Sequence, residues 1–251
     1  MIRAIMHGCN GAMGQTITHL AEEDPGIEIV AGIDLDTKMQ NHYPVFSSLE
    51  QCDVEADVVI DFASAKATDA LLQSLIRKRL PAVLCSTGLS GEQLRAVEAA
   101  SEQVAILKSA NMSLGVNTLF KVLETITPLL AESGFDIEIV EKHHNRKIDA
   151  PSGTALALAD VMNKVMNNSY VYQYDRTKES KKREKQEIGI SAIRGGTIVG
   201  EHDVIFAGTD EVITISHSAY SRAIFAKGAI AAAKYLAGKT AGYYDMADVI
   251  G

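Results

Sequence analysis

The first 110 residues alternate short apolar runs with helical patterns, and this alternation constrains the fold more than any other feature. Helical patterns such as "AKATDALLQSLIRKR" and "GEQLRAVEAASEQ" lie between several of the apolar runs. Apolar strands joined by helices are typical of parallel sheets covered on both faces. The sequence therefore predicts a doubly wound α/β domain of the Rossmann type. Its expected strands are 2–8, 27–34, 57–63, 81–87 and 104–110.

The pattern changes after residue 111 and predicts a second domain of the α+β class. A long helix is expected over 115–132, then a strand at 135–144 and a helix from about 152 to 167. The strand patterns that follow indicate a mixed or antiparallel sheet, and a last amphipathic helix is expected over 221–238. These later strands are expected within 188–194, 196–208 and 211–219, with a hairpin turn at 208–211.

Charge and cysteine usage exclude several classes of function. The formal net charge of −8 argues against a general nucleic-acid binder, and no apolar run reaches the roughly 18 residues of a membrane helix. Three cysteines without a C-x-x-C pair argue against a disulfide framework or a zinc site. The N-terminus has no signal-peptide pattern. We expect a soluble cytoplasmic protein without a metal, and we interpret the charged run 176–187 as a solvated loop.

The stretch "HGCNGAMG" places three glycines directly after the first expected strand. Gly8 would permit a tight turn, Gly11 would let the backbone approach a pyrophosphate, and Gly14 would let the helix pack closely. The second strand ends at Asp34, 20 residues after Gly14, where a carboxylate would bind a ribose hydroxyl. The spacing differs from the commoner G-x-G-x-x-G, so a glycine turn without a ligand is the alternative. Asp34 slightly favours NADH, while the nearby Lys38 leaves NADPH open.

Two further strand ends, "CSTG" and "SANMS", should reach the same crevice, because open α/β sheets bind ligands beyond the carboxyl ends of their strands. Ordinary turn chemistry is the alternative for each loop. The residues predicted to bind the dinucleotide are Gly8, Cys9, Asn10, Gly11, Ala12, Met13, Gly14, Asp34, Cys85, Ser86, Thr87, Ser109, Ala110, Asn111 and Met112.

The stretch "EKHHNRKIDAPSGTALALA" (141–159) gathers protonatable groups beside a helix start. A histidine can deliver a proton near neutral pH, and the ammonium of Lys147 can donate a proton or bind a carboxylate. The hydroxyls and N–H groups of Ser152, Gly153 and Thr154 would bind an anion at the helix start. A pocket for a small, multiply anionic molecule follows. The alternative is that Ser152 only caps the helix, and we expect Arg146 to face solvent.

The run "HHNRKIDAPSGTA" resembles the signature H-H-x-x-K-x-D-A-P-S-G-T-A of the 4-hydroxy-tetrahydrodipicolinate reductase family, also called dihydrodipicolinate reductase. The likeness extends to "GCNGAMG", "STG", "SANMSLGVN", "IRGGTIVGEHDVIFAG", "ISHSAYSR" and "DMADVIG". It implies NADH- or NADPH-dependent reduction of 4-hydroxy-tetrahydrodipicolinate, a cyclic dicarboxylate, to tetrahydrodipicolinate. Water is lost, and the step serves lysine and diaminopimelate biosynthesis.

The resemblance also implies roles and an organisation. It matches His143 to the active-site proton donor and acceptor, Lys147 to the proton donor, and His144, Gly153 and Thr154 to substrate-binding positions. Which of His143 and Lys147 delivers the proton stays open. Family members are homotetramers assembled through the sheet of the second domain. The chain returns near Arg222, which divides it into a dinucleotide domain (1–114 and 222–251) and a substrate domain (115–221).

Two departures and two alternatives accompany this interpretation. Cys85 stands where a glycine is usual in the family, and Asp34 is shorter than the glutamate of some members. A different two-domain dehydrogenase, acting on an amino acid or sugar, would not need the paired histidines and Lys147 in this arrangement. A catalytically inactive nucleotide-binding regulator would not need to keep His143 and Lys147.

Overall fold

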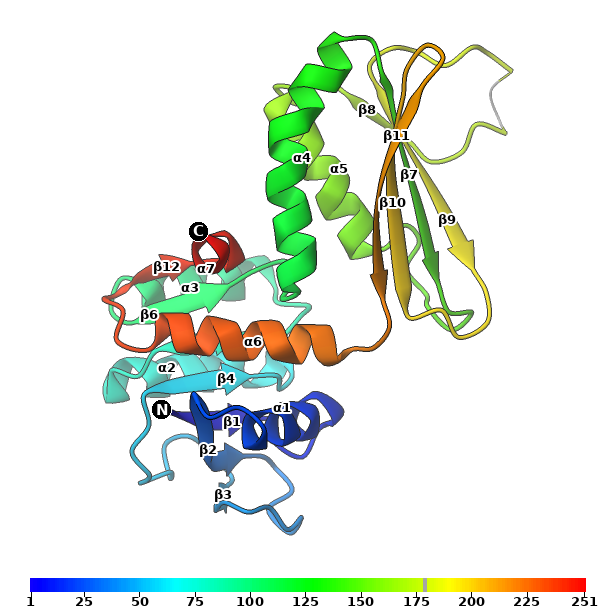
Figure 1. The fold of residues 1–251 in the computed structure, drawn as a ribbon. Helices are drawn as coiled ribbons and strands as arrows, with labels where there is room; N and C mark the ends of the chain where they lie inside the picture. Colours follow the sequence, from blue (N-terminus) through cyan, green and yellow to red (C-terminus); the bar gives the residue numbers. More distant parts are fainter. Residues whose placement is uncertain (178–179) are drawn as a thin grey trace. The chain divides into compact units, whose positions relative to one another are not determined.

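The computed structural model describes residues 1–177 and 180–251 and divides them into two compact units. Met1–Leu114 and Ala223–Gly251 form the first unit, and Gly115–Arg222 forms the second. The chain therefore leaves the first unit once and returns to it for the last helix (Figure 1).

The first unit is built on a seven-stranded sheet in the order β12-β6-β5-β4-β1-β2-β3, and every neighbouring pair is parallel. This confirms the doubly wound α/β prediction. Its strands are β1 (Ile2–His7), β2 (Ile27–Ile33), β3 (Val45–Phe46), β4 (Val58–Asp61), β5 (Ala82–Leu84), β6 (Ala105–Lys108) and β12 (Gly242–Tyr244). Its helices are α1 (Ala12–Glu22), the 3₁₀ turn η1 (Ala65–Ala67), α2 (Thr68–Lys78), α3 (Gly91–Ser101), α6 (Ala223–Leu236) and α7 (Met246–Ile250).

Helices cover both faces of this sheet, so its strands are apolar on both sides. One face packs on α1 and α6, with Met6, Ile17 and Ala229 fully buried between the layers. The other face packs on α2 and α3, where Leu75 and Val97 are fully buried. The strand order reverses at β1, which lies between β2 and β4. In open α/β sheets this switch point is where ligands bind.

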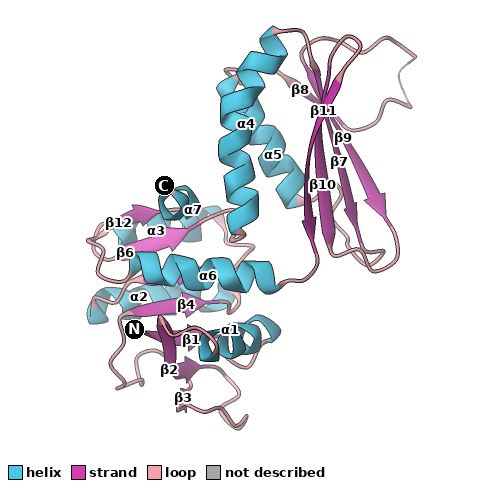
Figure 2. Cartoon of the chain, viewed as in Figure 1, coloured by secondary structure: helices cyan, strands magenta, loops and turns pink. Residues whose placement is uncertain are grey.

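The second unit pairs two helices with a mixed five-stranded sheet in the order β11-β10-β7-β9-β8 (Figure 2). β7 is parallel to β9 and antiparallel to β10, which makes the sheet mixed, as predicted. Its helices are α4 (Leu114–Glu132) and α5 (Gly153–Val165), and its strands are β7 (Asp136–His143), β8 (Val171–Gln173), β9 (Glu187–Arg194), β10 (Gly200–Ala207) and β11 (Val212–Ala219).

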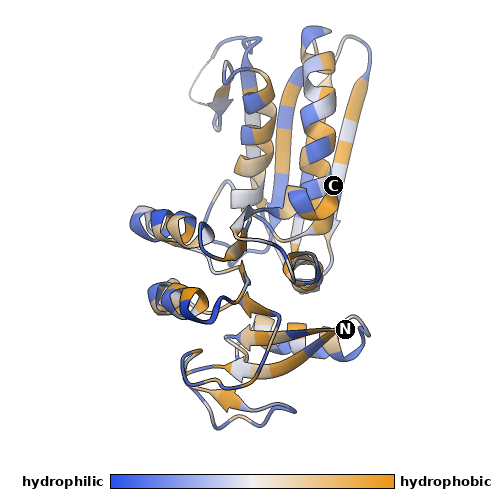
Figure 3. Ribbon diagram, turned by 90° about the vertical axis from the view of Figure 1, so that its left-hand side faces the viewer, coloured by the Kyte–Doolittle hydropathy of each residue, from blue (hydrophilic) through white to orange (hydrophobic). Residues whose placement is uncertain are grey.

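Alternation along β7 decides which side chains of this sheet are buried. Ile137, Ile139, Glu141 and His143 are buried, and the residues between them are half-buried. The helices α4 and α5 both lie on the side of the buried residues (Figure 2). Hydrophobic and hydrophilic residues alternate along these elements (Figure 3). A glutamate and a histidine therefore follow two isoleucines on the buried side of β7.

The predicted elements are present with ends shifted by a few residues, but four short ones were not expected. These are the strands β3, β8 and β12 and the helix α7. The hairpin turn after β10 is present, with Gly208 N–H donating to the carbonyl of Glu211 at 2.9 Å.

The prediction of a solvated loop over 176–187 is wrong for Arg183 and Glu187, whereas residues 184–186 are exposed. Arg183 is half-buried and donates to Glu138 and Asp136 at 3.0 and 2.8 Å. Glu187 is buried as the first residue of β9. Arginine side chains that reach neighbouring strands can bury their stems, which charge patterning alone does not reveal. Residues 178–179 of this run lie outside the described residues.

Candidate active site

The glycine turn has the backbone of a phosphate-binding loop. Gly8 has φ of 80°, in the left-handed region, and a Cβ on Gly14 would lie 2.2 Å from the carbonyl oxygen of Gly8. Helix α1 therefore begins in direct contact with the turn. No side chain caps this helix at Gly11, and its first turn holds no acidic residue. Its N-terminal N–H groups point to a place for an anion, so the residues present fit a dinucleotide pyrophosphate.

Asp34 lies beside this loop at the end of β2. Its carboxylate accepts a hydrogen bond from the backbone N–H of Asn10 at 3.0 Å. The Asn10 side chain is held in turn by Asn41, whose amide donates to it at 2.9 Å. The loop and the carboxylate are thus fixed together at neighbouring strand ends. This is the geometry that a ribose-binding acid needs in a Rossmann domain.

The other predicted cofactor loops follow β5 and β6 at the same sheet edge. The ammonium of Lys108 donates to the carbonyl of Ser86 at 3.2 Å, and burial lowers the pKa of Lys108. Burial and the nearby Asp61 raise the pKa of the Cys85 thiol well above its usual value. Asn111 is nearly buried and accepts from Ser113 N–H at 2.8 Å.

The remaining predicted cofactor residues differ in exposure, which limits how they could contact a ligand. The side chains of Cys9 and Met112 belong to the hydrophobic core, so these two residues could contact a ligand only through their backbone. The other residues of the loops are half-buried or exposed: Ala12, Met13, Thr87, Ser109 and Ala110.

The sequence prediction missed the strand end after β4, which adjoins the glycine turn. Phe62 N–H donates to the carbonyl of His7 at 3.0 Å, and a Cβ on Gly8 would meet Ala63 N at 3.0 Å. His7 and Asp61 form a buried pair beneath the turn, with Nδ1 and Oδ1 2.8 Å apart. The signal was present, because "IDFAS" also ends an apolar strand before a helix.

In the second unit, the buried carboxylate of Glu141 joins the elements of the histidine-rich stretch. It lies 2.6 Å from Nδ1 of His143 and accepts from Ser152 N–H at 3.0 Å. The guanidinium of Arg194 donates to both carboxylate oxygens, at 2.7 and 2.6 Å. Burial pushes the pKa of Glu141 upward, but the hydrogen bonds from Arg194, His143 and Ser152 outweigh it and leave the pKa lowered.

Ser152 caps helix α5, as the alternative interpretation held. Its hydroxyl accepts from Ala155 N–H at 3.1 Å and lies 2.9 Å from Nε2 of His202. The His202 ring packs edge-on against that of His143, with centroids 5.2 Å apart. Burial, then the nearby His143, lowers the pKa of His202 to about 4. Of the predicted substrate residues, Gly153 is exposed and Thr154 is half-buried at the helix start.

We expect the low pKa of His202 to make the protein lose stability in mild acid. Between about pH 6.5 and pH 4 the unfolded chain binds a proton on this imidazole that the folded chain does not, so stability falls as the pH falls. The pKa shift of His202 corresponds to a loss of about 3 kcal/mol in the free energy of unfolding over this pH range. In urea unfolding at pH 4 to 7, His202→Gln should lose less stability on acidification than the wild type. His42→Gln, at an exposed side chain, is the control. Parallel curves for wild type and His202→Gln would contradict the assignment.

Lys147 is held by its neighbour in the loop that follows β7. Its ammonium lies 2.8 Å from Oδ1 of Asp149, and this ion pair lowers the pKa of Asp149. Arg194 donates to the carbonyl of Asp149 at 2.6 Å, so the loop is tied to the Glu141 cluster. The ammonium is therefore oriented by an ion pair within the loop that also carries His144.

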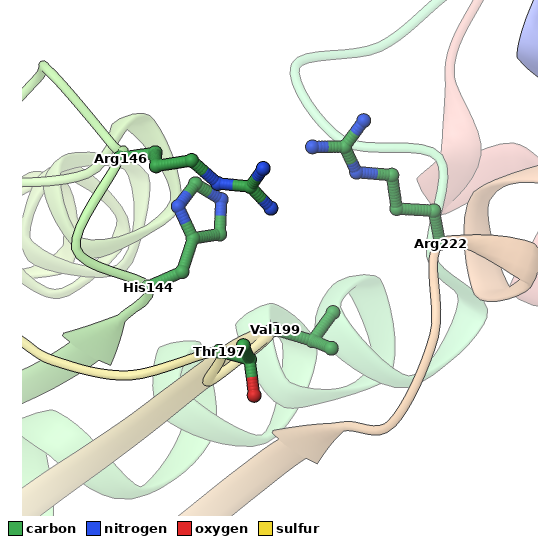
Figure 4. A pocket seen from close by; sticks show the side chains of 5 residues that line it. All are labelled: His144, Arg146, Thr197, Val199 and Arg222. Atoms are coloured by element: carbon green, nitrogen blue, oxygen red, sulfur yellow. The ribbon is translucent and has the colours of Figure 1, made fainter.

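A pocket of about 580 Å³ opens beside this loop, lined by His144, Arg146, Thr197, Val199 and Arg222 (Figure 4). Arg146 and Arg222 extend toward one another from opposite sides of it. Partial burial and then the positive charges of Arg146 and Arg222 lower the pKa of His144. None of the described residues that line the pocket is acidic, so it suits an anion. Arg146 is exposed, as predicted, but lines this pocket.

Among the described residues, no group of three or more His, Cys, Asp or Glu side chains is placed to hold a metal ion. No helix in the described part of the chain is long and apolar enough to cross a membrane.

Comparison with known proteins identifies the family. A family model described as "Dihydrodipicolinate reductase, N-terminus" matches residues 2–112, and "Dihydrodipicolinate reductase, C-terminus" matches residues 115–250. A 4-hydroxy-tetrahydrodipicolinate reductase of Caldanaerobacter subterraneus subsp. tengcongensis is 52% identical, covering 100% of this chain and 98% of the relative. One from Staphylococcus epidermidis is 48% identical over 93% of this chain and 95% of the relative.

Solved structures agree on the fold. Dipicolinate-bound dihydrodipicolinate reductase from Paenisporosarcina sp. TG-14 has a TM-score of 0.81 at 24% identity, covering 100% of both chains. A myo-inositol dehydrogenase from Corynebacterium glutamicum has a TM-score of 0.61 at 13% identity, covering 100% of this chain and 92% of that one. The family models and the curated relatives confirm the resemblance predicted from the signature. The chain therefore belongs to the dihydrodipicolinate reductase family and is an oxidoreductase.

Proposed function

We propose that the protein catalyses the NAD(P)H-dependent reduction of 4-hydroxy-tetrahydrodipicolinate to tetrahydrodipicolinate, in lysine and diaminopimelate biosynthesis. The observation that carries the proposal is the pocket lined by His144, Arg146 and Arg222, beside the loop that carries Lys147. A cyclic dicarboxylate carries two negative charges, which such a pocket can bind. Relatives that match 100% and 93% of the chain are named 4-hydroxy-tetrahydrodipicolinate reductase.

A bound nicotinamide dinucleotide would supply the hydride. The residues that would hold it are the loop from Gly8 to Gly14 for the pyrophosphate and Asp34 for the ribose, since they share one sheet edge. The loops that begin at Cys85 and Ser109 end neighbouring strands and would line the nicotinamide side. The amide of Asn10 already engages Asp34, so its carboxylate is oriented before a ligand arrives.

The proposed proton transfer belongs to residues of the second unit. His143 has its Nδ1 engaged by Glu141, which leaves Nε2 as the nitrogen that can exchange a proton. The Lys147 ammonium, oriented by Asp149, can donate a proton or neutralise a substrate carboxylate. We assign substrate binding to His144, Gly153 and Thr154, with Ser152 contributing through the helix start that it caps.

The test is steady-state oxidation of NADH and then NADPH, followed at 340 nm with freshly generated 4-hydroxy-tetrahydrodipicolinate. Turnover with either dinucleotide supports the proposal, and the ratio of the two kcat/KM values gives the cofactor preference. Folded protein that binds a dinucleotide but turns over neither would refute it. A dehydrogenase for another substrate, or a nucleotide-binding regulator, would then explain the chain better.

Asp34→Ala should raise the KM for NADH more than the KM for NADPH. The carboxylate binds the free ribose hydroxyl of NADH but repels the 2′-phosphate of NADPH, so its loss harms only the first. We expect roughly a tenfold rise for NADH, corresponding to the loss of one charge-assisted hydrogen bond. The matched control is Asp36→Ala, an exposed carboxylate two residues further along the chain. Equal changes for both dinucleotides would remove Asp34 from the ribose site.

We further propose that the protein is a homotetramer assembled through the five-stranded sheet. In the described part of the second unit, α4 and α5 lie on one face and no helix covers the other (Figure 2). That open face carries partly exposed apolar residues on three strands, namely Val140, Ile193 and Ile205. Sedimentation equilibrium should give four chains per particle, and a monomer would refute the assembly.

We also propose that the protein works in the cytoplasm. Its free cysteines Cys9, Cys52 and Cys85 fit the reducing conditions there.

A further inference from the structure

We propose that Glu141 is a positioning residue, whose carboxylate fixes the ring orientation and tautomer of His143 and ties the catalytic loop to the start of α5. The inference rests on the proposed function, because it assigns Glu141 a part in the proton transfer of that reaction. It goes beyond the roles that the signature implies, because the signature starts at His143 and assigns no role to Glu141.

The position of Glu141 on β7 places its side chain on the same face as that of His143. The two residues are two positions apart on one strand, so their side chains share the helix-covered face. The Glu141 residue is 0% exposed, and one oxygen lies 2.6 Å from Nδ1 of His143. Its pKa is lowered, so the group is a carboxylate and can only accept. Nδ1 of His143 is therefore the donor, and Nε2 is the nitrogen left for proton exchange.

The carboxylate also connects three parts of the signature: His143, the Lys147–Asp149 pair and Ser152. One oxygen accepts from His143 and Arg194, and the other accepts from Ser152 N–H and Arg194. Arg194 then donates to the carbonyl of Asp149, the residue that orients Lys147. A buried charge is strongly destabilising unless it is fully paired, so a glutamate at a core position needs all of these partners.

The opposite side of the His143 ring is confined as well. A Cβ on Gly200 of β10 would lie 3.1 Å from Nε2, and the His202 ring packs edge-on at 5.2 Å between centroids. With the ring held on both sides, the carboxylate decides which nitrogen carries the proton. A ring free to flip would offer the wrong nitrogen for part of the time.

The experiment uses the Glu141→Gln variant and follows the tautomer directly. Ser152 N–H can only donate, so the carbonyl of the introduced amide must face Ser152 and the amino group of that amide must face His143. Nδ1 of His143 would then become an acceptor, and the proton would move to Nε2. Long-range ¹H–¹⁵N spectra of histidine-labelled protein should show the Nδ1–H tautomer in the wild type and its loss in Glu141→Gln. We expect kcat to fall about 100-fold while the Kd for the dinucleotide is unchanged.

Glu138→Gln is the matched control. Glu138 lies on the same strand, on the opposite face, and likewise accepts from two arginines, Arg176 and Arg183, at 2.8 and 3.0 Å. Its side chain is 30% exposed whereas that of Glu141 is 0% exposed, so Glu138→Gln should lower the Tm by less and should keep the His143 tautomer and kcat.

Three results would overturn the proposal. One is an unchanged tautomer in Glu141→Gln, and another is a kcat within twofold of the wild type. The third is an equal loss of kcat in Glu138→Gln, which would show that destabilisation alone explains the effect. If the wild type itself does not turn over the substrate, the proposed function fails. The tautomer comparison then decides the role of Glu141 by itself.

Discussion

Lys147→Ala should lower kcat by roughly 100- to 1,000-fold while leaving the Kd for the dinucleotide nearly unchanged. General acid catalysis and charge neutralisation each contribute effects of this size. The ammonium lies on the loop after β7, whereas the dinucleotide residues belong to the other unit. The variant also leaves Asp149 without its ion-pair partner, which adds a negative charge near an anionic substrate. We therefore expect the KM for the substrate to rise as well. Rates at 340 nm and dinucleotide fluorescence titration measure the two effects separately.

Lys164→Ala is the control for this variant, because Lys164 lies exposed in the last turn of α5 in the same unit. It removes the same charge from the protein without touching the loop, so kcat should stay at the wild-type value. A Lys147→Ala protein that keeps the wild-type kcat would show that Lys147 is not catalytic. His143 would then be left as the proton donor of the signature.

The fold could be predicted from the sequence wherever alternation or an apolar run extended along a whole strand or helix. The strand β7 alternates along its whole length, and β1 and β4 lie in continuous apolar runs between helical patterns. β3 and β12 have two and three residues, and unlike the equally short β5 they do not lie in an apolar run that helical patterns flank. They exist because neighbouring strands offer unpaired backbone groups, which is a property of the assembled sheet.

The candidate site was predictable in its local parts and not in its long-range ones. His143, Lys147 and Ser152 lie within ten residues of one another, so one stretch of sequence brought them together. Arg194 lies 53 residues from Glu141, and only strand pairing between β7 and β9 places them side by side. Glu141 itself was within reach, because an acid two positions before His143 on an alternating strand must share its buried face.

The departure at Cys85 has a structural explanation in the neighbouring strand end. Its N–H donates to the carbonyl of Asp61 at 2.9 Å, so this amide is engaged by the protein whichever side chain stands there. The thiol is half-buried, and burial and the nearby Asp61 raise its pKa well above the usual value. A cysteine in place of glycine therefore adds a side chain beneath the loop but leaves the backbone hydrogen bond of the loop in place.

Gly14→Ala should weaken dinucleotide binding by at least about tenfold, although alanine is the better helix former by up to about 1 kcal/mol. The added Cβ would lie 2.2 Å from the carbonyl oxygen of Gly8 and 2.7 Å from Cα of Cys9. Both are backbone atoms of the turn itself, so they cannot move aside as a flexible side chain would. Overpacking of this kind costs about 1–3 kcal/mol, which exceeds the gain in helix propensity. Titration with NADH would measure the loss of affinity, and thermal unfolding would measure the loss of stability.

Gly91→Ala separates this effect from the general cost of a methyl group. Gly91 also begins a helix of the first unit, and a Cβ there would meet nothing nearer than the guanidinium of Arg95 at 3.7 Å. The variant should keep the wild-type affinity for NADH and should not lower the Tm. If Gly14→Ala bound NADH as tightly as Gly91→Ala does, the contact between α1 and the turn would not shape the phosphate site. The dinucleotide would then have to be held mainly by the loops after β5 and β6.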